Sequence, residues 1–141
     1  MQSSKDIFKF HQAQTFSYAS CLEIDSAKGS YIYDVDGNRY LDFVAGVSAC
    51  TLGHSNPVVI NAVKAQLDKF THVMVYGEYV QSPQYRLAKL LSEQLPESLC
   101  TSYFVNSGTE SIEGAMKLSK RATGRSEIIS CKFSYYGSTH G

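Results

Sequence analysis

The stretch that decides the fold is T-S-Y-F-V-N-S-G-T-E-S-I-E-G-A-M-K-L-S-K-R-A-T-G-R-S-E-I-I-S-C, residues 101–131. Residues 101–105 form a short apolar run with aromatic and β-branched side chains, which predicts a buried strand. Apolar side chains then recur at helical spacing, and Gly124 is typical of the residue that ends a helix. Residues 127–131 predict a second strand. This order of strand, loop, helix and strand predicts a βαβ unit and a parallel α/β sheet.

The loop between the first predicted strand and the helix, Asn106-Ser107-Gly108-Thr109, is suited to bind one phosphate group. A helix N-terminus presents unpaired backbone N–H groups and partial positive charge. Gly108 lets a ligand approach the backbone, and the Ser107 and Thr109 hydroxyls offer further hydrogen bonds. The alternative is that Ser107 or Thr109 only caps the helix, whose dipole already meets the carboxylate of Glu110. The loop matches no nucleoside-triphosphate or dinucleotide glycine pattern.

The segment F-S-Y-Y-G-S-T-H-G, residues 133–141, follows the second predicted strand. Ligands of parallel α/β sheets bind beyond the carboxyl ends of the strands, so this segment is expected at the ligand-binding edge. Tyr135 or Tyr136 there either stacks on a flat, phosphorylated ring or packs against the end of the sheet. The residues by themselves leave both interpretations open.

Three elements are predicted upstream of this unit. Aromatic residues flank the turn sequence D-V-D-G-N within residues 29–43, a pattern that predicts a hairpin of two short strands. The pair Asn56-Pro57 predicts the start of a helix that runs to about Lys69. The pair Ser82-Pro83 predicts the start of a second helix, which Pro96 ends.

Composition excludes several classes of protein. Apolar residues make up 43% and charged residues 18% of the 141 residues, as in globular proteins, and the formal net charge is zero, without the basic excess that binds nucleic acid. No apolar run is long enough to cross a bilayer, and the N-terminus lacks a secretory signal. The cysteines and histidines show no metal-ligand spacing, and His54 is predicted to order the turn before the helix at Asn56-Pro57. We expect a cytoplasmic protein that binds no metal, membrane or nucleic acid.

Five motifs occur in a fixed order along the chain: G-S-Y-I-Y-D-V-D-G-N-R-Y-L-D-F-V-A-G-V (29–47), L-G-H-S-N-P (52–57), F-V-N-S-G-T-E-S-I-E-G-A-M-K-L (104–118), T-G-R-S-E-I-I (123–129) and Y-Y-G-S-T-H-G (135–141). This ordered set resembles the N-terminal part of the class III aminotransferases that depend on pyridoxal phosphate, such as those acting on acetylornithine or 4-aminobutyrate. Each motif alone is weak, but the whole set is specific.

The resemblance implies an α/β protein of fold type I. That fold has a large three-layer α/β/α domain with a seven-stranded sheet, plus a small domain built from both chain ends. The chain is expected to be this fold truncated to its N-terminal part, with residues 1–75 starting the small domain and dimer interface. Residues 76–141 are expected to open the large cofactor-binding domain. Members of the family are homodimers, so a homodimer is the implied assembly.

The resemblance assigns five positions that bind pyridoxal 5'-phosphate: Ser107, Gly108, Thr109, Tyr135 and Tyr136. The first three match the family's phosphate cup, and Tyr135 matches the aromatic residue that stacks on the pyridine ring. Tyr136 stands where the family usually has histidine. Val47 matches a position that lines the substrate entrance.

The resemblance implies transfer of an amino group from an ω-amino donor, such as acetylornithine or 4-aminobutyrate, to a keto acid such as 2-oxoglutarate. The Schiff-base lysine of relatives lies downstream, and no lysine here matches it, so we expect that lysine beyond Gly141 and no catalytic residue in this chain. The chain alone is therefore expected to be inactive. The alternatives are an aminomutase of the glutamate-1-semialdehyde type and a non-catalytic phosphate-binding fragment.

Overall fold

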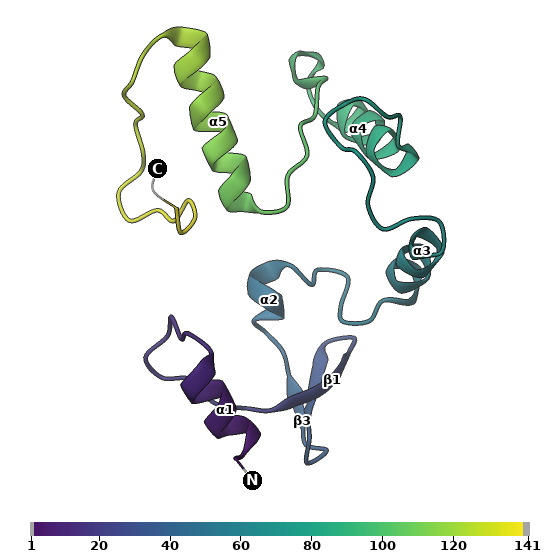
Figure 1. Cartoon of the computed structure of the whole chain (residues 1–141), viewed down its shortest axis with the longest axis vertical. Coiled ribbons are helices and arrows are strands. Elements are labelled where there is room, and N and C mark those ends of the chain that lie inside the picture. The colour runs from purple at the N-terminus through teal and green to yellow at the C-terminus, as the bar shows by residue number, and fades with distance from the viewer. Residues whose placement is uncertain (1, 140–141) are drawn as a thin grey trace. The chain divides into compact units, whose positions relative to one another are not determined.

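The computed structural model describes residues 2–139 and divides the chain into two compact units, Met1–Val73 and Met74–Gly141. Figure 1 shows the elements along the chain. The last two residues of the predicted domain 76–141 and of the motif Y-Y-G-S-T-H-G lie outside the described residues. Each unit is described by itself below.

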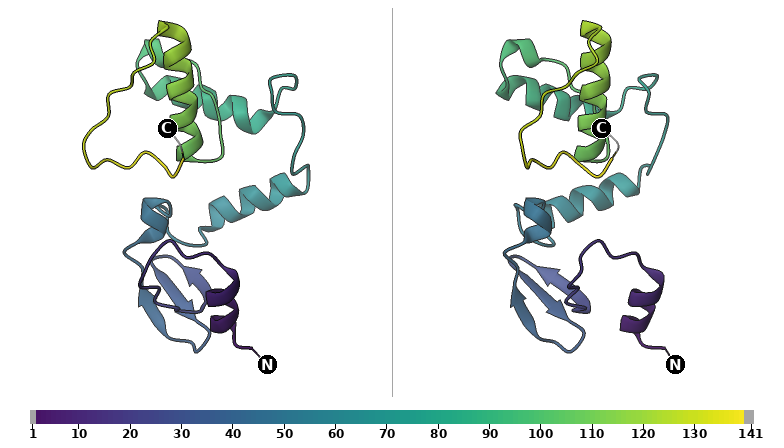
Figure 2. Two further views of the ribbon diagram at one scale, coloured as in Figure 1. Left: turned by 60° about the vertical axis from the view of Figure 1, so that its left-hand side comes forward. Right: turned by 90° about the vertical axis from the view of Figure 1, so that its left-hand side faces the viewer.

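The first unit contains one antiparallel sheet, two regular helices and one four-residue segment whose φ/ψ values are not those of a right-handed helix. Its elements are α1 (Ser4–His11), β1 (Ile24–Lys28), β2 (Tyr31–Asp34), β3 (Arg39–Leu41), α2 (Ala45–Ser48) and α3 (Pro57–Leu67). The strand order is β1-β2-β3, and Figure 2 shows the three strands side by side. The predicted hairpin within residues 29–43 is confirmed, with Ile32 opposite Tyr40 in its register. The strand β1 and the helix α1 were not predicted, because residues 1–28 show no clear hydrophobic period.

Asp34 closes the turn between β2 and β3. Its Oδ1 accepts hydrogen bonds from the backbone N–H groups of Asp36 (3.0 Å) and Asn38 (2.8 Å). Its Oδ2 accepts from the side-chain amide of Asn38 (2.9 Å) and from the Tyr40 hydroxyl (2.8 Å). These bonds, that of the Asn38 amide above all, hold the pKa of Asp34 below its usual value, although desolvation raises it. Asp34 is 7% exposed and is the one buried residue in the range 2–139.

The regular secondary structure described in the second unit consists of helices alone. Its elements are α4 (Ser82–Gln94), the short 3-10 helix η1 (Glu97–Leu99) and α5 (Gly108–Thr123). The predicted helix at Ser82-Pro83 is confirmed and ends before Pro96, as the prediction required. In the first unit, α3 likewise starts at Pro57 behind the Asn56 cap and ends two residues before Lys69.

The two strands predicted in this unit, residues 101–105 and 127–131, do not form, so the predicted βαβ unit is wrong for this structure. Both segments are irregular, and no strand occurs in the described part of the second unit. A parallel strand needs a neighbour that pairs with its N–H and C=O groups, and the described residues supply no such neighbour.

No hydrophobic side chain is buried among the residues that the structure describes. Apolar side chains on α3, α4 and α5 are partly or largely exposed, as for Val63 (50%), Leu90 (56%) and Leu118 (69%). Hydrogen bonds within each helix, with side-chain caps at the N-termini of α3 and α5, rather than a common core, therefore define these helices.

Three further features concern expectations drawn from composition. None of the helices in residues 2–139 is both long enough and apolar enough to cross a bilayer. Within the same range, no three His, Cys, Asp or Glu side chains gather as metal ligands would. The four cysteines are all free thiols.

Candidate functional site

A hollow of about 510 Å³ lies at the N-terminal end of α5, and we call it the α5 hollow. The chain that follows α5 runs back along the helix to this end, as Figures 1 and 2 show. The residues that line the hollow are Gly108, Thr109, Ser111, Ile112, Tyr135, Tyr136 and Gly137. Four of the five positions expected to bind the cofactor thus surround one cavity, and the fifth, Ser107, is the residue before Gly108.

Ser107 and Glu110 cap the N-terminus of α5 with a reciprocal pair of hydrogen bonds. The Ser107 Oγ accepts from the backbone N–H of Glu110 (3.2 Å). The Glu110 Oε2 accepts from the backbone N–H groups of Asn106 (2.6 Å) and Ser107 (3.1 Å). Of the two residues considered as caps, Ser107 makes the cap, and the Thr109 hydroxyl is not used for it.

The first two backbone N–H groups of α5 are the donors in the hollow that are free to bind an anion. The N–H groups of Gly108 and Thr109 donate to no acceptor within residues 2–139. They lie at the positive end of the helix dipole, where a phosphate is stabilised. The Thr109 hydroxyl and the proton of the Ser107 hydroxyl add donors beside them. Because the Glu110 carboxylate binds the amides that precede the helix, it leaves these donors open.

The two tyrosines of the hollow are fixed by their hydroxyl groups. The Tyr135 hydroxyl lies 2.9 Å from the Ser138 hydroxyl, and the Tyr136 hydroxyl accepts from the backbone N–H of Cys131 (3.3 Å). Tyr135 is 78% exposed and Tyr136 is 42% exposed. Tyr135 therefore presents an exposed ring in the hollow that the Gly108 and Thr109 amides also line, whereas the Tyr136 side chain also anchors the loop.

Gly137 is a site residue that the sequence did not indicate. Its φ is +124°, and a Cβ at this position would lie 2.9 Å from both Cβ and Cγ2 of Thr109. Only a glycine allows the loop to approach the first turn of α5 this closely. Ser111 and Ile112 were also missed as lining residues, although both follow directly from a hollow at the first turn of the helix.

Val47, the expected substrate residue, lies in the first unit within a left-handed turn. Ala45, Gly46, Val47 and Ser48 all have positive φ, between 48° and 65°. This conformation costs about 1–2 kcal/mol for each residue other than glycine. It is rarest for a β-branched residue such as Val47. The Val47 side chain is 88% exposed, so it stands out from the chain at the end of a strained turn.

The side chains of Asp42 and His54 form a hydrogen-bonded pair beside this turn. The Asp42 Oδ2 lies 2.7 Å from the His54 Nε2, and the Asp42 Oδ1 accepts from the backbone N–H groups of Val44 (3.0 Å) and Ala45 (2.9 Å). The bond from Ala45, followed by that with His54, holds the pKa of the Asp42 carboxyl below its usual value. His54 was predicted to order the turn before the helix at Asn56-Pro57; its side chain instead contacts Asp42, a partner that the sequence did not indicate.

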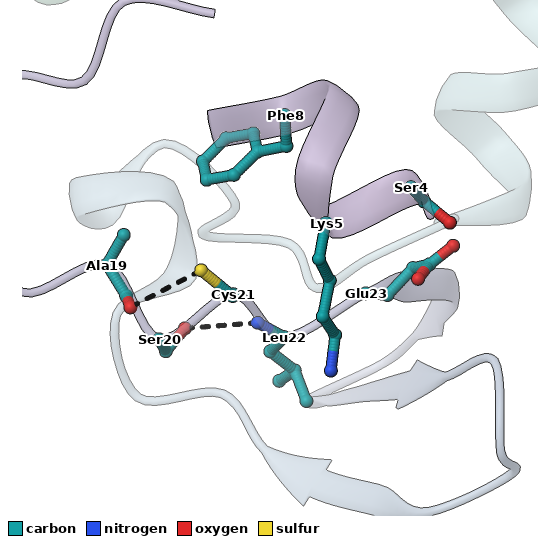
Figure 3. A pocket seen from close by; sticks show the side chains of 8 residues that line it. All are labelled: Ser4, Lys5, Phe8, Ala19, Ser20, Cys21, Leu22 and Glu23. Carbon is teal, nitrogen blue, oxygen red and sulfur yellow. Dashed lines mark hydrogen bonds between the residues drawn. The ribbon is translucent and has the colours of Figure 1, made fainter. Parts of the chain in front are cut away.

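A second hollow, of about 320 Å³, lies between α1 and the segment that precedes β1. Figure 3 shows Lys5 and Phe8 of α1 beside this segment. The polar groups of the segment bind one another, since the Cys21 Sγ donates to the carbonyl oxygen of Ala19 at 3.6 Å. None of the residues expected to bind cofactor or substrate lines this hollow.

Comparison with known proteins places the chain in a defined family. The family described as Aminotransferase class-III matches residues 13–141. The acetylornithine aminotransferase of Archaeoglobus fulgidus is 38% identical over 133 residues, which are 94% of this chain and 34% of the relative. That of Methanopyrus kandleri is 40% identical over 141 residues, all of this chain and 35% of the relative. The chain thus spans about a third of the length of these relatives.

Solved structures agree with the sequence relatives. The adenosylmethionine-8-amino-7-oxononanoate aminotransferase of Methanocaldococcus jannaschii superposes with a TM-score of 0.87 at 29% identity, covering 96% of this chain and 33% of that one. The taurine:2-oxoglutarate aminotransferase of Bifidobacterium kashiwanohense, solved with PLP and glutamate, gives 0.82 at 32% identity, covering 94% and 30%. The predicted α/β class of fold type I is confirmed for the third of that fold that the chain spans.

Proposed function

The chain belongs to the class-III aminotransferases, and we propose that it supplies the phosphate- and ring-binding part of a transaminase that uses pyridoxal 5'-phosphate. The proposed reaction moves an amino group from an ω-amino donor, acetylornithine or 4-aminobutyrate, to 2-oxoglutarate. The donor leaves as a carbonyl compound, and 2-oxoglutarate leaves as glutamate. Of the two donors, acetylornithine is the one that the names of the relatives, acetylornithine aminotransferases, support.

The observation that carries the proposal is the pair of unpaired amides in the α5 hollow. Gly108 and Thr109 offer N–H groups at a helix N-terminus, and Tyr135 offers an exposed aromatic ring in the same hollow. A phosphate group and a flat ring joined in one ligand meet both features. The volume, about 510 Å³, lies within the range of about 300–1,000 Å³ that is usual for small-molecule sites. The residues present therefore fit pyridoxal phosphate.

The chain's own residues would bind and orient the cofactor. When bound, pyridoxal phosphate supplies the electron sink for the reaction. The Gly108 and Thr109 amides and the Thr109 hydroxyl would hold the phosphate, with the Ser107 hydroxyl beside them. Tyr135 would cover one face of the ring. Because Ser107 and Glu110 already cap α5, the amides are held ready before the ligand arrives.

Several roles in this proposal rest on the family resemblance alone. Val47 is assigned to the substrate entrance, and the Schiff-base lysine is expected downstream of this chain. The homodimer, the cytoplasmic location and the division into a small domain and a cofactor domain are likewise expectations for the whole protein. Tyr136 in place of the usual histidine is assigned to the ring's edge.

The proposal is tested by titrating the whole protein with pyridoxal phosphate while recording its absorbance. Tyr135→Ala should weaken binding about two- to twelvefold, as expected for the loss of one aromatic contact, and should shift the absorbance of the bound cofactor. Tyr103→Ala is the matched control, because Tyr103 is 85% exposed in the same unit but does not line the α5 hollow. Equal effects of the two substitutions would contradict the assignment of Tyr135.

The reaction is tested by incubating the whole protein with 2-oxoglutarate and either acetylornithine or 4-aminobutyrate, and measuring glutamate. Glutamate formation that depends on the donor is the expected result. Cofactor binding without glutamate, together with an internal shift of an amino group within one substrate, would favour the aminomutase. Phosphate binding without any amino transfer would favour the non-catalytic alternative.

A further inference from the structure

The left-handed turn α2, which carries Val47, is not held by hydrophobic packing. The apolar side chains in and before it are exposed, at 90% for Phe43, 68% for Val44 and 88% for Val47. Three of its four residues with positive φ are not glycine, so the turn does not form from local backbone preference either. Something outside the turn must therefore stabilise it.

Asp42 supplies that contact on one side. Its Oδ1 accepts from two successive backbone N–H groups, those of Val44 and Ala45, at the point where the chain enters the turn. The carboxylate is held in place by its second oxygen, which lies 2.7 Å from the His54 Nε2. The Asp42 side chain is only 11% exposed and that of His54 only 20% exposed, so solvent screens the pair weakly.

His54 is in turn fixed to the residue that joins β1 to β2. Its backbone N–H donates to the Gly29 carbonyl oxygen (2.7 Å), and its carbonyl oxygen accepts from the Gly29 N–H (3.0 Å). A Cβ on the preceding Gly53 would lie 3.1 Å from the Gly29 carbonyl oxygen, so this backbone approach is close. A continuous set of hydrogen bonds thus runs from the sheet through His54 and Asp42 to the turn.

We propose that Asp42 and His54 are positioning residues that hold the left-handed turn Ala45–Ser48 against the sheet of the first unit and thereby fix the place of Val47. The pair then acts on recognition of the amino donor and not on binding of the cofactor. This second step rests on the proposed function, in which Val47 lines the substrate entrance. The holding of the turn does not depend on it.

Asp34 provides a matched comparison within the same sheet. Its carboxylate makes four hydrogen bonds, against three at Asp42, and it is more buried, but every partner lies within its own hairpin, at most six residues away. Asp34→Asn should therefore weaken the hairpin without moving the turn at Ala45–Ser48. A purely structural role of the Asp42–His54 pair would make its variants behave like Asp34→Asn.

The first measurement is amide hydrogen exchange in the whole protein. The turn contains the bonds from Ser48 N–H to the Val44 carbonyl (3.2 Å) and from Cys50 N–H to the Ala45 carbonyl (2.9 Å). His54→Ala should speed exchange of these two amides by about tenfold or more, as expected when a local contact that closes the turn is lost. His54→Gln keeps a side-chain N–H donor and should restore slow exchange, and Asp34→Asn should leave both amides unchanged. Unchanged exchange in His54→Ala would overturn the proposal.

The second measurement is steady-state kinetics of the whole protein with 2-oxoglutarate and acetylornithine, or 4-aminobutyrate where only that donor reacts. His54→Ala should raise KM for the donor by about tenfold with kcat within about twofold of wild type, which is the signature of lost ground-state binding. The dissociation constant of pyridoxal phosphate should not change. A loss of kcat or of cofactor affinity at constant KM would overturn the proposal, as would an equal rise of KM in Asp34→Asn.

A replacement variant and the exchange rates cover the two ways in which these measurements could fail. If His54→Ala does not fold, Asp42→Asn takes its place, because it keeps an acceptor for the turn amides and removes the charge that faces His54. If the wild-type protein transaminates neither donor, the proposed function is wrong, and the exchange rates alone then decide whether the pair holds the turn.

Discussion

The turn between β2 and β3 and the turn that starts α5 each contain a glycine and a carboxylate, but the carboxylates bind different groups. Asp34 binds amides inside its own turn and the Tyr40 hydroxyl, and it becomes the buried residue of the described chain. Glu110 binds the amides that precede α5, so those of Gly108 and Thr109 keep no protein acceptor in residues 2–139. A turn closed by its own carboxylate is structural, whereas one left open can bind an anion.

The two units differ in the same way in their strands. In the first unit, β2 pairs with β1 on one side and with β3 on the other. In the second unit, residues 101–105 and 127–131 have the composition of strands but form no strand within the described residues. Within the described residues, the second unit therefore combines unpaired amides at the start of α5 with two segments that form no strand.

The largest expected effect concerns catalysis by the 141-residue chain alone. Purified free of the whole protein, it should form no glutamate from acetylornithine or 4-aminobutyrate and 2-oxoglutarate, because no lysine here matches the Schiff-base position of the family. The whole protein, assayed in parallel, is the control. Turnover by the isolated chain would show that its own residues complete the site.

A second expectation concerns the cooperativity of the same isolated chain. It should unfold without a sharp thermal transition, because no hydrophobic side chain is buried within the described residues. Hydrogen exchange should distinguish the units, with slower exchange in the paired strands β2 and β3 than in residues 101–105. A cooperative transition of a monodisperse monomer would contradict this picture, as would equal exchange in the two regions.

A third expectation tests the open turn at α5 in the whole protein. Thr109→Ala removes a hydroxyl that would bind the charged phosphate, a contact worth about 1.5–3 kcal/mol. Affinity for pyridoxal phosphate should therefore fall about ten- to a hundredfold, measured by titration of the apoprotein. Thr123→Ala is the matched control, since the Thr123 hydroxyl donates to the Ser119 carbonyl (2.8 Å) at the opposite end of the same helix. If Thr109→Ala only lowers the melting temperature, the phosphate assignment fails.

The smallest expected effect tests the closed turn at Asp34 by acid. Hydrogen bonds, that from the Asn38 amide first, hold the pKa of Asp34 below the ordinary value of 3.8. The folded state therefore binds this proton less readily than the unfolded state, so the contribution of Asp34 to stability is complete above about pH 4 and is lost as the pH falls through the lower folded value. Denaturant unfolding of the whole protein between about pH 6 and pH 2 measures this loss. Asp34→Asn should reduce the change in the free energy of unfolding between these pH values. An unchanged pH dependence of that free energy would contradict the assignment.

Helix boundaries were predictable because the interactions that set them are local. Asn56 caps α3 through its side chain and the N–H two residues later, and Ser107 caps α5 through the N–H three residues later. Gly124 ends α5 in the left-handed conformation at φ 70°, as its place in the sequence predicted. Such contacts span fewer than five residues, so composition and spacing are enough to indicate them.

The sequence by itself determined the capped helices, the hairpin at residues 29–43, the open amides at Gly108 and Thr109, and the family. Only the tertiary structure decided that residues 101–105 and 127–131 form no strand in the described chain, and that Gly137 lies against Thr109. It alone placed His54 beside Asp42, across 12 residues, and set Val47 in a left-handed turn. The physical reason is that these features depend on contacts between distant segments. Residue spacing does not indicate such contacts. Each of them closes a loop at a cost in chain entropy, and only the interactions between the two segments that meet offset that cost.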